Sequence, residues 1–442
     1  MKRLFLLLLG LYLPLQVQGF EIVYPKSDNV SLYSDKTFFI GNENPANTLT
    51  INENIVPIHP SGGFKYPVNL EEGENIFIIK NENLKKEYKV TRLTSKNINN
   101  NKYKEFETSI NIEITKDNVP LRSTPVDEGI NRLQHLERGI IFTAIGEYGD
   151  FFKVKLARDD YAWISKSNVK QINEENIKSK ILHFDYNELP NERIYKIKLS
   201  KKVPYTISEY HGLDVVLYSI ENDEFDKYEF HISSEKLFGY SSYYEPDNTL
   251  VVKVTNKPSI ENLIVTVDAG HGGDEFGAIG CLGDKEKDIN LEIAKKLQQK
   301  LLEKNIKTLM TRENDVNMSL ADRVKFSNKN NSNIYISIHN NALPDNFADR
   351  EATGSEVYYS YPQSKRLAQS ILKSLTEELQ LKNNGVKQQN FAVVRNTNAL
   401  SVLIEIAYII NPDDNAKLQS ENFQNNVADA IVHGLENFIN EK

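Results

Sequence analysis

Residues 263–305 decide the fold of the C-terminal part of this chain. They read LIVTVDAG, then a glycine-rich loop, then the helical pattern DINLEIAKKLQQKLLEKN. Six of the 21 glycines in the chain lie between Gly270 and Gly283. Apolar residues recur at helical spacing in the last pattern, at Ile289, Ile293, Leu297 and Leu301. An apolar strand that leads through a loop into such a helix indicates an alternating β and α fold.

The same alternation continues to the C-terminus. Strand patterns (IKTLMTR, IYISIHNN, GSEVYYS and SVLIEIAYI) alternate with helical patterns (SLADRVKFSNKN, SKRLAQSILKSLTEELQ and NNVADAIVHGLENFI). The sequence therefore predicts an α/β domain at residues 261–442 with a mainly parallel, twisted sheet. In such sheets, ligands gather at the carboxyl ends of the strands.

The chain before this domain is predicted to be all β. Short apolar runs alternate with turn-rich segments there, which favours small β domains at residues 20–95, 106–172 and 176–257. A polar segment around residues 95–105 is interpreted as a linker. Trp163, the only tryptophan, is predicted to complete a core rather than to form a ligand platform, because large aromatic side chains usually fill small barrels.

Residues 1–19 are predicted to be a secretory signal peptide. Lys2 and Arg3 precede an apolar run of about a dozen residues, which is too short to span a bilayer comfortably. A retained membrane anchor is the alternative. The sequence thus predicts an exported protein of the periplasm or cell wall, with no stable membrane span after cleavage. Cys281 is the only cysteine, which excludes an intrachain disulfide, and the net charge of −8 argues against a nucleic-acid partner.

Two histidines and one glutamate stand where an α/β sheet presents its ligands. His271 follows the strand LIVTVDAG, His339 ends the strand IYISIHNN, and Glu286 lies at the start of the first helix. Each has an ordinary explanation when taken alone: a hydrogen-bonded loop histidine, or an acid that favours the helix dipole. Together they form a catalytic zinc set of two imidazoles and one carboxylate, with the fourth position left for water.

A further glutamate lies within a strand that should be buried. Glu405 occupies the middle of SVLIEIAYII, where a carboxylate is costly unless it is paired or its pKa is shifted. Pairing with Arg312 or Arg395 is the structural explanation. The functional explanation is a general base and acid beside the metal-activated water.

The C-terminal domain resembles the zinc N-acetylmuramoyl-L-alanine amidase family of the amidase-3 type. The resemblance rests on ordered motifs: VDAGHGG, GAIGCLGDKEKDINLEIA, YISIHNNA, GSEVYY and FAVVRNTNALSVLIEIAYIINPDD. It implies that His271, Glu286 and His339 bind Zn²⁺ and that Glu405 is catalytic. The implied substrate is the peptidoglycan amide that joins the lactyl group of N-acetylmuramic acid to L-alanine.

Some features near these motifs bear on substrate and control. Asn340 and Arg395 are candidates for orienting peptide or glycan. Cys281 lies between two predicted ligands in sequence, and it is an alternative metal contact. Between Tyr361 and Ser364 there is no long insertion, so the blocking helix of some relatives is not expected and activator-gated control is in doubt.

The three β domains resemble modules of exported bacterial enzymes. They are similar, in order, to Ig-like, bacterial SH3-like and AMIN modules. Because residues 20–257 show no cluster of catalytic side chains, these domains are expected to bind the wall or to position the enzyme, and division or wall-remodelling proteins are candidate partners. The alternatives for the whole chain are an inactive wall-binding or scaffold protein and a zinc deacetylase acting on sugars, although the HxxxH pair is missing.

Overall fold

The computed structural model describes six segments of the chain, residues 20–93, 102–129, 131–221, 226–234, 236–343 and 352–441. The predicted signal peptide lies outside these segments, and so does most of the predicted linker. Within the described segments, no helix has both the length and the apolar character needed to cross a membrane.

Residues 20–93, the first β region, form two sheets around one core. The three-stranded sheet has the order β1 (Glu21–Tyr24), β3 (Lys36–Asn42), β6 (Gly63–Asn69). The five-stranded sheet has the order β2 (Asn29–Leu32), β8 (Lys85–Arg92), β7 (Gly73–Lys80), β4 (Thr50–Ile51), β5 (Asn54–Ile55). Phe39 and Phe64 from the first sheet pack with Ile79 and Val90 from the second, so each sheet covers the apolar face of the other.

Residues 102–172, the second β region, form one seven-stranded sheet. Its order is β11 (Arg132–Leu136), β10 (Val119–Arg122), β14 (Tyr161–Ser165), β13 (Phe151–Lys155), β12 (Ile141–Tyr148), β9 (Lys104–Ile114), β15 (Val169–Ile172), and η1 (Lys166–Asn168) precedes β15.

Residues 179–258, the third β region, form two sheets. One has the order β16 (Ile181–Glu188), β17 (Glu192–Leu199), β22 (Thr249–Thr255), β21 (Tyr240–Tyr244). The other has the order β18 (Tyr205–Glu209), β19 (Gly212–Tyr218), β20 (Lys227–Ser233). The second and third β regions share one continuous apolar core, so they pack directly against each other.

The prediction that Trp163 fills a core is wrong. Strand β14 places Ala162 and Ile164 fully inside, and alternation along the strand turns Trp163 to the opposite face. There its ring stands edge-on to Tyr103 and Tyr148, at centroid distances of 6.1 and 6.5 Å. Trp163 is therefore part of a half-exposed aromatic cluster.

The C-terminal α/β domain is built on a six-stranded sheet. Its order is β24 (Lys307–Met310), β23 (Ile264–Ala269), β25 (Ile334–Asn341), β28 (Leu400–Tyr408), β26 (Ser355–Tyr359), β27 (Asn383–Gln388). Neighbouring strands run parallel, except that β26 is antiparallel to β28. As predicted, many-stranded β sheets precede this domain in the chain.

Helices cover both faces of this sheet. One face carries α1 (Glu286–Glu303), α3 (Lys365–Glu378) and α5 (Glu421–Asn440), which share a large apolar core with the strands. The other face carries α2 (Leu320–Lys329) and η4 (Ala392–Arg395). Alternation decides which side chains meet which layer, because Ile336 faces the first core whereas Tyr335 packs with Val393 and Val394. The remaining elements are α4 (Pro412–Leu418), η2 (Ile260–Asn262) and η3 (Pro362–Ser364).

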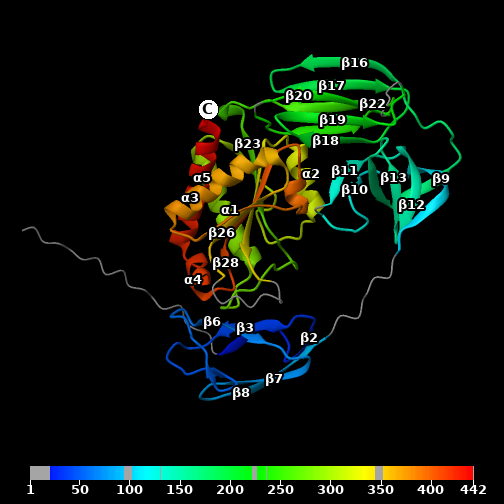
Figure 1. The fold of residues 1–442 in the computed structure, drawn as a ribbon. Coiled ribbons are helices and arrows are strands. Elements are labelled where there is room, and N and C mark those ends of the chain that lie inside the picture. Colours follow the sequence, from blue (N-terminus) through cyan, green and yellow to red (C-terminus); the bar gives the residue numbers. More distant parts are fainter. Residues whose placement is uncertain are drawn as a thin grey trace, which may run out of the picture.

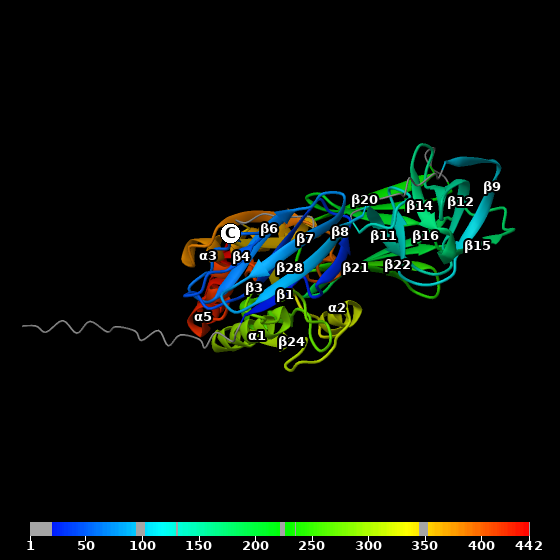
Figure 2. The same ribbon diagram turned by 90° about the horizontal axis from the view of Figure 1, so that it is seen from below.

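The α/β domain lies between the first and third β regions (Figure 1). The first β region sits beside α4, and the third adjoins the opposite side of the domain, above it in the view. The view from below places the second and third β regions together at one side of the α/β domain (Figure 2).

Candidate active site

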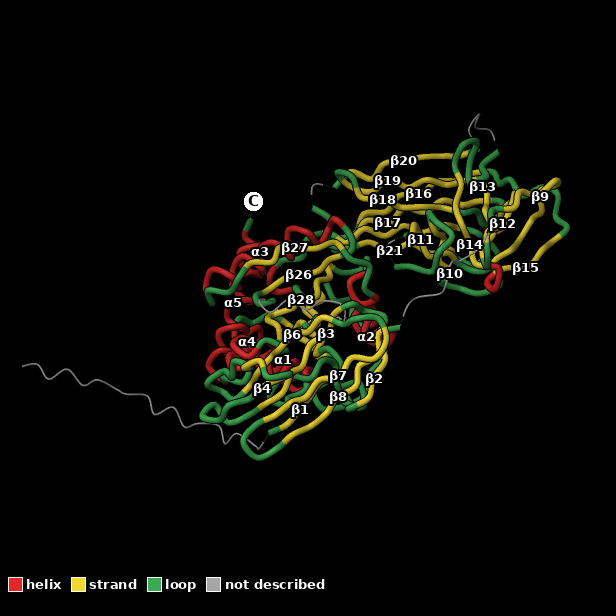
Figure 3. The backbone as a smooth tube through the Cα atoms, turned by 60° about the horizontal axis from the view of Figure 1, so that its bottom comes forward, coloured by secondary structure: helices red, strands yellow, loops and turns green. Residues whose placement is uncertain are grey.

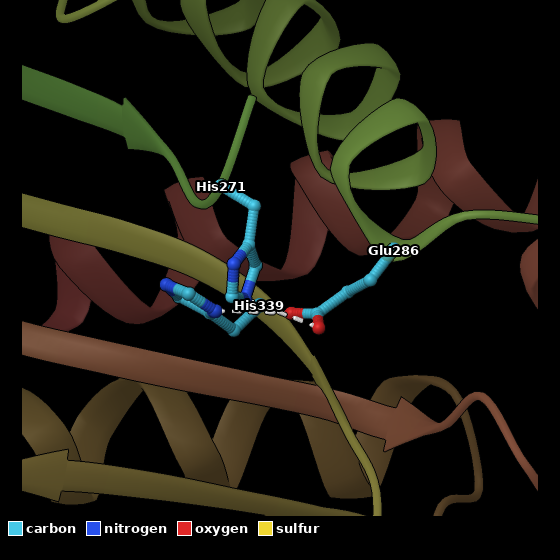
Figure 4. Close-up of side chains that lie close together, drawn as sticks. All are labelled: His271, Glu286 and His339. Carbon is cyan, nitrogen blue, oxygen red and sulfur yellow. Dashed lines mark hydrogen bonds and ion pairs between the residues drawn. The ribbon is translucent and has the colours of Figure 1, made fainter. Parts of the chain in front are cut away.

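Three side chains converge at the carboxyl ends of β23 and β25 (Figure 4). His271 follows β23, His339 lies near the end of β25, and Glu286 is the first residue of α1. Nε2 of His271 is 3.2 Å from Oε2 of Glu286, and Nδ1 of His339 is 3.0 Å from Oε1. One possible ligand atom from each of the three lies within 4.8 Å of the others.

The glycine-rich loop makes room for these rings. A Cβ on Gly270 would lie 2.3 Å from Nε2 of His339, and a Cβ on Gly277 would lie 2.4 Å from Oε2 of Glu286. Both contacts are closer than any side chain tolerates. His271 itself has a φ of 59°, a strained conformation for a residue with a side chain. The loop sequence therefore serves close approach of backbone to imidazole and carboxylate.

The Glu286 carboxylate is buried and held from several sides. Oε2 accepts a hydrogen bond from the Ala278 amide at 2.9 Å, and Oε1 accepts bonds from the Asn340 amide and from Nδ2 of Asn290, both at 3.2 Å. Burial alone would raise the pKa of Glu286, but the contacts with His271 and His339 lower it well below its ordinary value. The group is thus a carboxylate anion facing two imidazoles.

Two buried arginines fix the backbone that carries His271. Arg323 of α2 donates to the carbonyl oxygens of His271 and Ala269, each at 2.7 Å, and to Oδ1 of Asp268 at 2.7 Å. Arg312 donates to the carbonyl oxygens of Ala269 at 2.9 Å and Gly270 at 3.0 Å. Five donors on each planar guanidinium allow one side chain to bind several carbonyls at once.

This pair of arginines was not found by sequence reasoning as part of the site. The sequence indicates Arg312 only as a pairing partner for Glu405, and it places Arg323 only within a helical pattern, SLADRVKFSNKN. Ser319 caps this helix, because its hydroxyl oxygen accepts a hydrogen bond from the Asp322 amide at 3.1 Å. The contacts of Arg323 depend on how α2 docks on the sheet, which no local pattern reveals.

Glu405 lies beside the cluster on β28, paired in register with His339. Its Oε2 is buried and has no hydrogen-bond partner within the described part of the chain. Burial first, then the charges of Glu286 and Glu356, raise the pKa of Glu405. The proposed pairing with arginine does not occur, because Arg312 binds backbone carbonyls and Arg395 binds the carbonyl and Oδ1 of Asn390.

A second buried glutamate faces Glu405 from the neighbouring strand. Glu356 of β26 is 1% exposed and stands opposite Glu405 in register. Oε1 accepts hydrogen bonds from Nδ2 of Asn341 at 2.7 Å and from the Tyr358 hydroxyl at 2.5 Å, and Lys387 pairs with Oε2. Sequence reasoning missed Glu356, although an acid within the apolar run GSEVYY is the same signal that drew attention to Glu405.

The two candidates for substrate orientation lie in different places. Asn340 is 2% exposed and its side-chain amide donates to Oδ1 of Asn290 at 2.8 Å, so it lies behind the cluster and supports Glu286. Arg395 belongs to η4, which precedes β28 and therefore lies towards the amino ends of the strands, away from His339. The structure brings neither side chain to the face of the cluster.

Cys281 also lies apart from the cluster. It is fully buried against the first β region, where a Cβ on Gly63 would approach its sulfur to 2.4 Å. Its position separates it from His271, Glu286 and His339, which gather without it.

Sequence comparisons place this site in a known family. Residues 265–437 match the family model of N-acetylmuramoyl-L-alanine amidases. An N-acetylmuramoyl-L-alanine amidase from Clostridium difficile 630, known from its crystal structure, is 33% identical over an alignment covering 98% of that chain and 41% of this one, with a TM-score of 0.39. The chain belongs to the N-acetylmuramoyl-L-alanine amidase family, because the family model matches it and one relative, described next, is 37% identical over 87% of its own length.

Three further relatives each match about two fifths of this chain. The uncharacterized protein YqiI of Bacillus subtilis is 37% identical over 41% of this chain and 87% of YqiI. The probable cell wall amidase LytH of Staphylococcus saprophyticus is 35% identical over 43% of this chain and 62% of LytH. The N-acetylmuramoyl-L-alanine amidase LytC of Bacillus subtilis is 34% identical over 41% of this chain and 37% of LytC. The chain thus spans less than two thirds of LytH and LytC, and the family match begins after the three β regions.

Proposed function

We propose that this protein is an exported, zinc-dependent amidase that hydrolyses the bond between the lactyl group of N-acetylmuramic acid and L-alanine of the peptide stem. The observation that carries the proposal is the convergence of His271, Glu286 and His339 beside Glu405. Family membership supports the reaction class, and relatives named as cell wall amidases support peptidoglycan as the substrate.

The donor set fits zinc. Two imidazoles and one carboxylate are the ligands of many catalytic zinc sites, whereas magnesium and calcium prefer oxygen donors alone. The ionised state of Glu286 supports this fit, because a metal ligand must be deprotonated. Zinc, when bound, polarises the amide carbonyl and lowers the pKa of water to about 7. The arginine contacts keep the His271 backbone in its strained position, ready for this role.

Glu405 is the proton shuttle in this proposal. It accepts a proton from the attacking water while the water oxygen bonds to the carbonyl carbon, and it donates that proton to the alanine nitrogen as the carbon–nitrogen bond breaks. The products are a lactyl carboxylate and the free amino group of L-alanine. The buried Oε2 without a partner supports this assignment, because the oxygen is not engaged elsewhere in the described chain.

Glu356 is a positioning residue in this scheme. Its carboxylate is fixed by Asn341, Tyr358 and Lys387, and it faces Glu405 across the β26–β28 pair. The fixed negative charge adds to burial in raising the pKa of Glu405, which makes its carboxylate a stronger base towards the attacking water.

The β regions serve to place the enzyme on the wall. We assign residues 20–95 to an Ig-like module, 106–172 to an SH3-like module and 176–257 to an AMIN-like module, with a signal peptide at 1–19 and the catalytic domain at 261–442. The half-exposed aromatic cluster around Trp163 supports a surface role for the second module. Replacing Trp163 with Ala should lower the fraction of protein that sediments with intact sacculi, and Trp163→Phe should restore most of it.

The test of the reaction is a digest of purified peptidoglycan with identification of the new ends by mass. The proposal expects free lactyl carboxylates on the glycan and new amino-terminal L-alanine on the peptides. Loss of an acetyl group from the sugar instead would identify a deacetylase. Stoichiometric zinc without any cleavage would identify an inactive wall-binding protein.

A further inference from the structure

A polar cavity lies where three parts of the chain meet, at the end of the six-stranded sheet opposite to His271, Glu286 and His339. It has a volume of about 340 Å³ and adjoins a larger space of about 670 Å³, with which it shares Tyr240, Ser241, Asn328 and Asn398. Figure 3 shows β11 of the second region and β21 of the third beside the catalytic domain on the side of α2.

This cavity is separate from the metal-ligand cluster. Asn333, which lines the larger space, immediately precedes β25, whereas His339 lies near the end of that strand. Six residues of strand separate the two ends by about 20 Å, at roughly 3.3 Å per residue. Arg395, Asn396 and Thr397 line the smaller space just before β28 begins.

Two arginines that have no carboxylate partner in the described chain lie at or near the smaller space. Arg395 lines it, and within the described residues no carboxylate pairs with Arg395 or with nearby Arg132. Burial first, and then Arg132, Arg395 and Arg122, lower the pKa of His135 to about 4. Glu137 is the acid of this lining, and it has neighbours of its own in Lys202 and Tyr205.

Buried polar atoms of the same lining lack partners. Asn396 is 5% exposed; its Oδ1 accepts from the Asn398 amide at 3.2 Å, but its Nδ2 has no partner within the described chain. Oδ1 of Asn328 and Oε2 of Glu137, which also line the cavity, are in the same situation, and so is Nε of Arg132, which lies near His135 behind the lining. Unpaired buried groups are costly, so donors and acceptors of this kind indicate a polar occupant.

We propose that this cavity binds a carboxylate-bearing saccharide, namely the glycan strand from which the peptide has been removed. Amide side chains and the tyrosine rings of Tyr240 and Tyr361 suit the hydroxyl groups and faces of a sugar, and Arg395 suits a carboxylate. The inference rests on the proposed function, because hydrolysis of the lactyl amide leaves a carboxylate on the muramyl sugar where the uncut strand has a neutral amide. The site therefore distinguishes processed from unprocessed glycan.

The test measures binding of peptide-free oligosaccharides of N-acetylglucosamine and N-acetylmuramic acid to the full chain by calorimetry. Three probes separate the sources of the carboxylate: the oligosaccharide, the same oligosaccharide with its lactyl groups amidated, and a free stem peptide. We expect the first to bind, with roughly tenfold or greater loss on amidation, as for a charge-assisted hydrogen bond. Preference for the stem peptide, or equal binding of the amidated sugar, would overturn the proposal.

Variants localise the binding. Arg395→Gln and Arg132→Gln should each weaken the acidic oligosaccharide by at least about tenfold. Arg158→Gln is the matched control, because Arg158 is exposed on a loop of the second β region. If Arg395→Gln does not fold, Arg132→Gln decides, and unchanged binding in the folded variants contradicts the site. Cleavage of sacculi is scored separately: cleavage without oligosaccharide binding refutes this site alone, and binding without cleavage refutes the proposed function alone.

Discussion

The two ends of the catalytic sheet differ in what packs against them. At the end that carries the metal-ligand cluster, Val23, Phe38 and Ile40 of the first β region join the same apolar core as Cys281 in the glycine-rich loop. At the other end, the third β region makes polar contacts, such as the Tyr240 amide bonded to the Thr397 carbonyl at 2.7 Å. The first contact is apolar and close-packed, and the second encloses a polar cavity.

The apolar contact lies close in sequence to a residue of the cluster. The loop that packs against the first β region, residues 278–282, leads directly to Glu286. Removal of the first β region would expose apolar side chains of that loop, so we expect the α/β domain to depend on this region for stability. The opposite end contains polar groups and a cavity, and such a site suits the binding of a ligand.

The largest expected effect is the loss of turnover and of zinc affinity when one of the three proposed metal ligands is removed. His339→Ala should abolish turnover and weaken zinc by more than the roughly 10- to 100-fold that loss of an outer-shell partner causes. Metal content of the purified chain and turnover on muropeptides measure both effects. His433→Ala, an exposed histidine on α5 that pairs with Glu378, is the control and should keep both. Full turnover in chelated, metal-free protein would refute the zinc assignment.

Replacing the proton shuttle should separate chemistry from metal binding at the same end. Glu405→Gln keeps shape and hydrogen bonding, but it cannot move a proton. We therefore expect normal folding and normal zinc content with turnover lowered by about 10²- to 10⁴-fold. Glu286→Gln is the informative contrast, because it should weaken zinc first. If Glu405→Gln lost zinc with unchanged turnover per bound metal, Glu405 would be a ligand instead.

The polar end should respond to pH through Glu209. Burial raises the pKa of Glu209 to about 7, and its Oε2 accepts a hydrogen bond from the Gln363 amide at 2.5 Å. Between its ordinary pKa of 4.5 and about 7, the folded chain holds a proton that the unfolded chain has released. Stability should therefore fall as pH rises through this window, by roughly 3 kcal/mol at most.

Urea unfolding at several pH values checks this expectation. Glu209→Gln should flatten the dependence over the window, because it mimics the protonated side chain at every pH. The neighbouring Tyr240 and Tyr361 stay protonated throughout, since burial raises the pKa of each hydroxyl above its ordinary value. The same slope in wild type and variant would show that other groups cause it.

Overpacking of the apolar contact should lower the stability of the chain. Gly63→Ala would place a methyl group 2.4 Å from the Cys281 sulfur, and overpacking of this kind costs roughly 1–3 kcal/mol. The double variant Gly63→Ala with Cys281→Ala should recover most of the loss, because the second change removes the clashing atom. Thermal unfolding of the two single variants and the double variant completes the cycle. Additive losses would show that the two residues do not touch in solution.

The metal-ligand cluster could be predicted because its signals are local. Each of His271 and His339 ends an apolar strand, and Glu286 begins a helix, so the parallel-sheet rule alone brings them to one edge. The glycines around His271 added a second local signal. Strand order was the only long-range information needed to predict that these residues lie close together.

The supporting residues could not be predicted because their partners are far away in sequence. Arg323 reaches His271 across 52 residues, and Glu356 faces Glu405 only because β26 runs antiparallel beside β28. The prediction for Trp163 was wrong for a different reason. Its residue type suggested a core position, but the two-residue period of the strand places its neighbours in the core instead. Counting the alternation Ala162, Trp163, Ile164 would have corrected the prediction.

The burial of Cys281 provides a native reporter of domain undocking. It is the only thiol in the chain, and it is fully covered where the first β region meets the glycine-rich loop. Burial also raises the pKa of its thiol, so the reactive thiolate forms only when the contact opens. The rate at which an aromatic disulfide reagent labels the folded chain therefore measures how often this contact separates, without any engineered probe. Wall fragments that slow or speed the labelling would reveal whether substrate engagement and docking of the first β region are energetically linked.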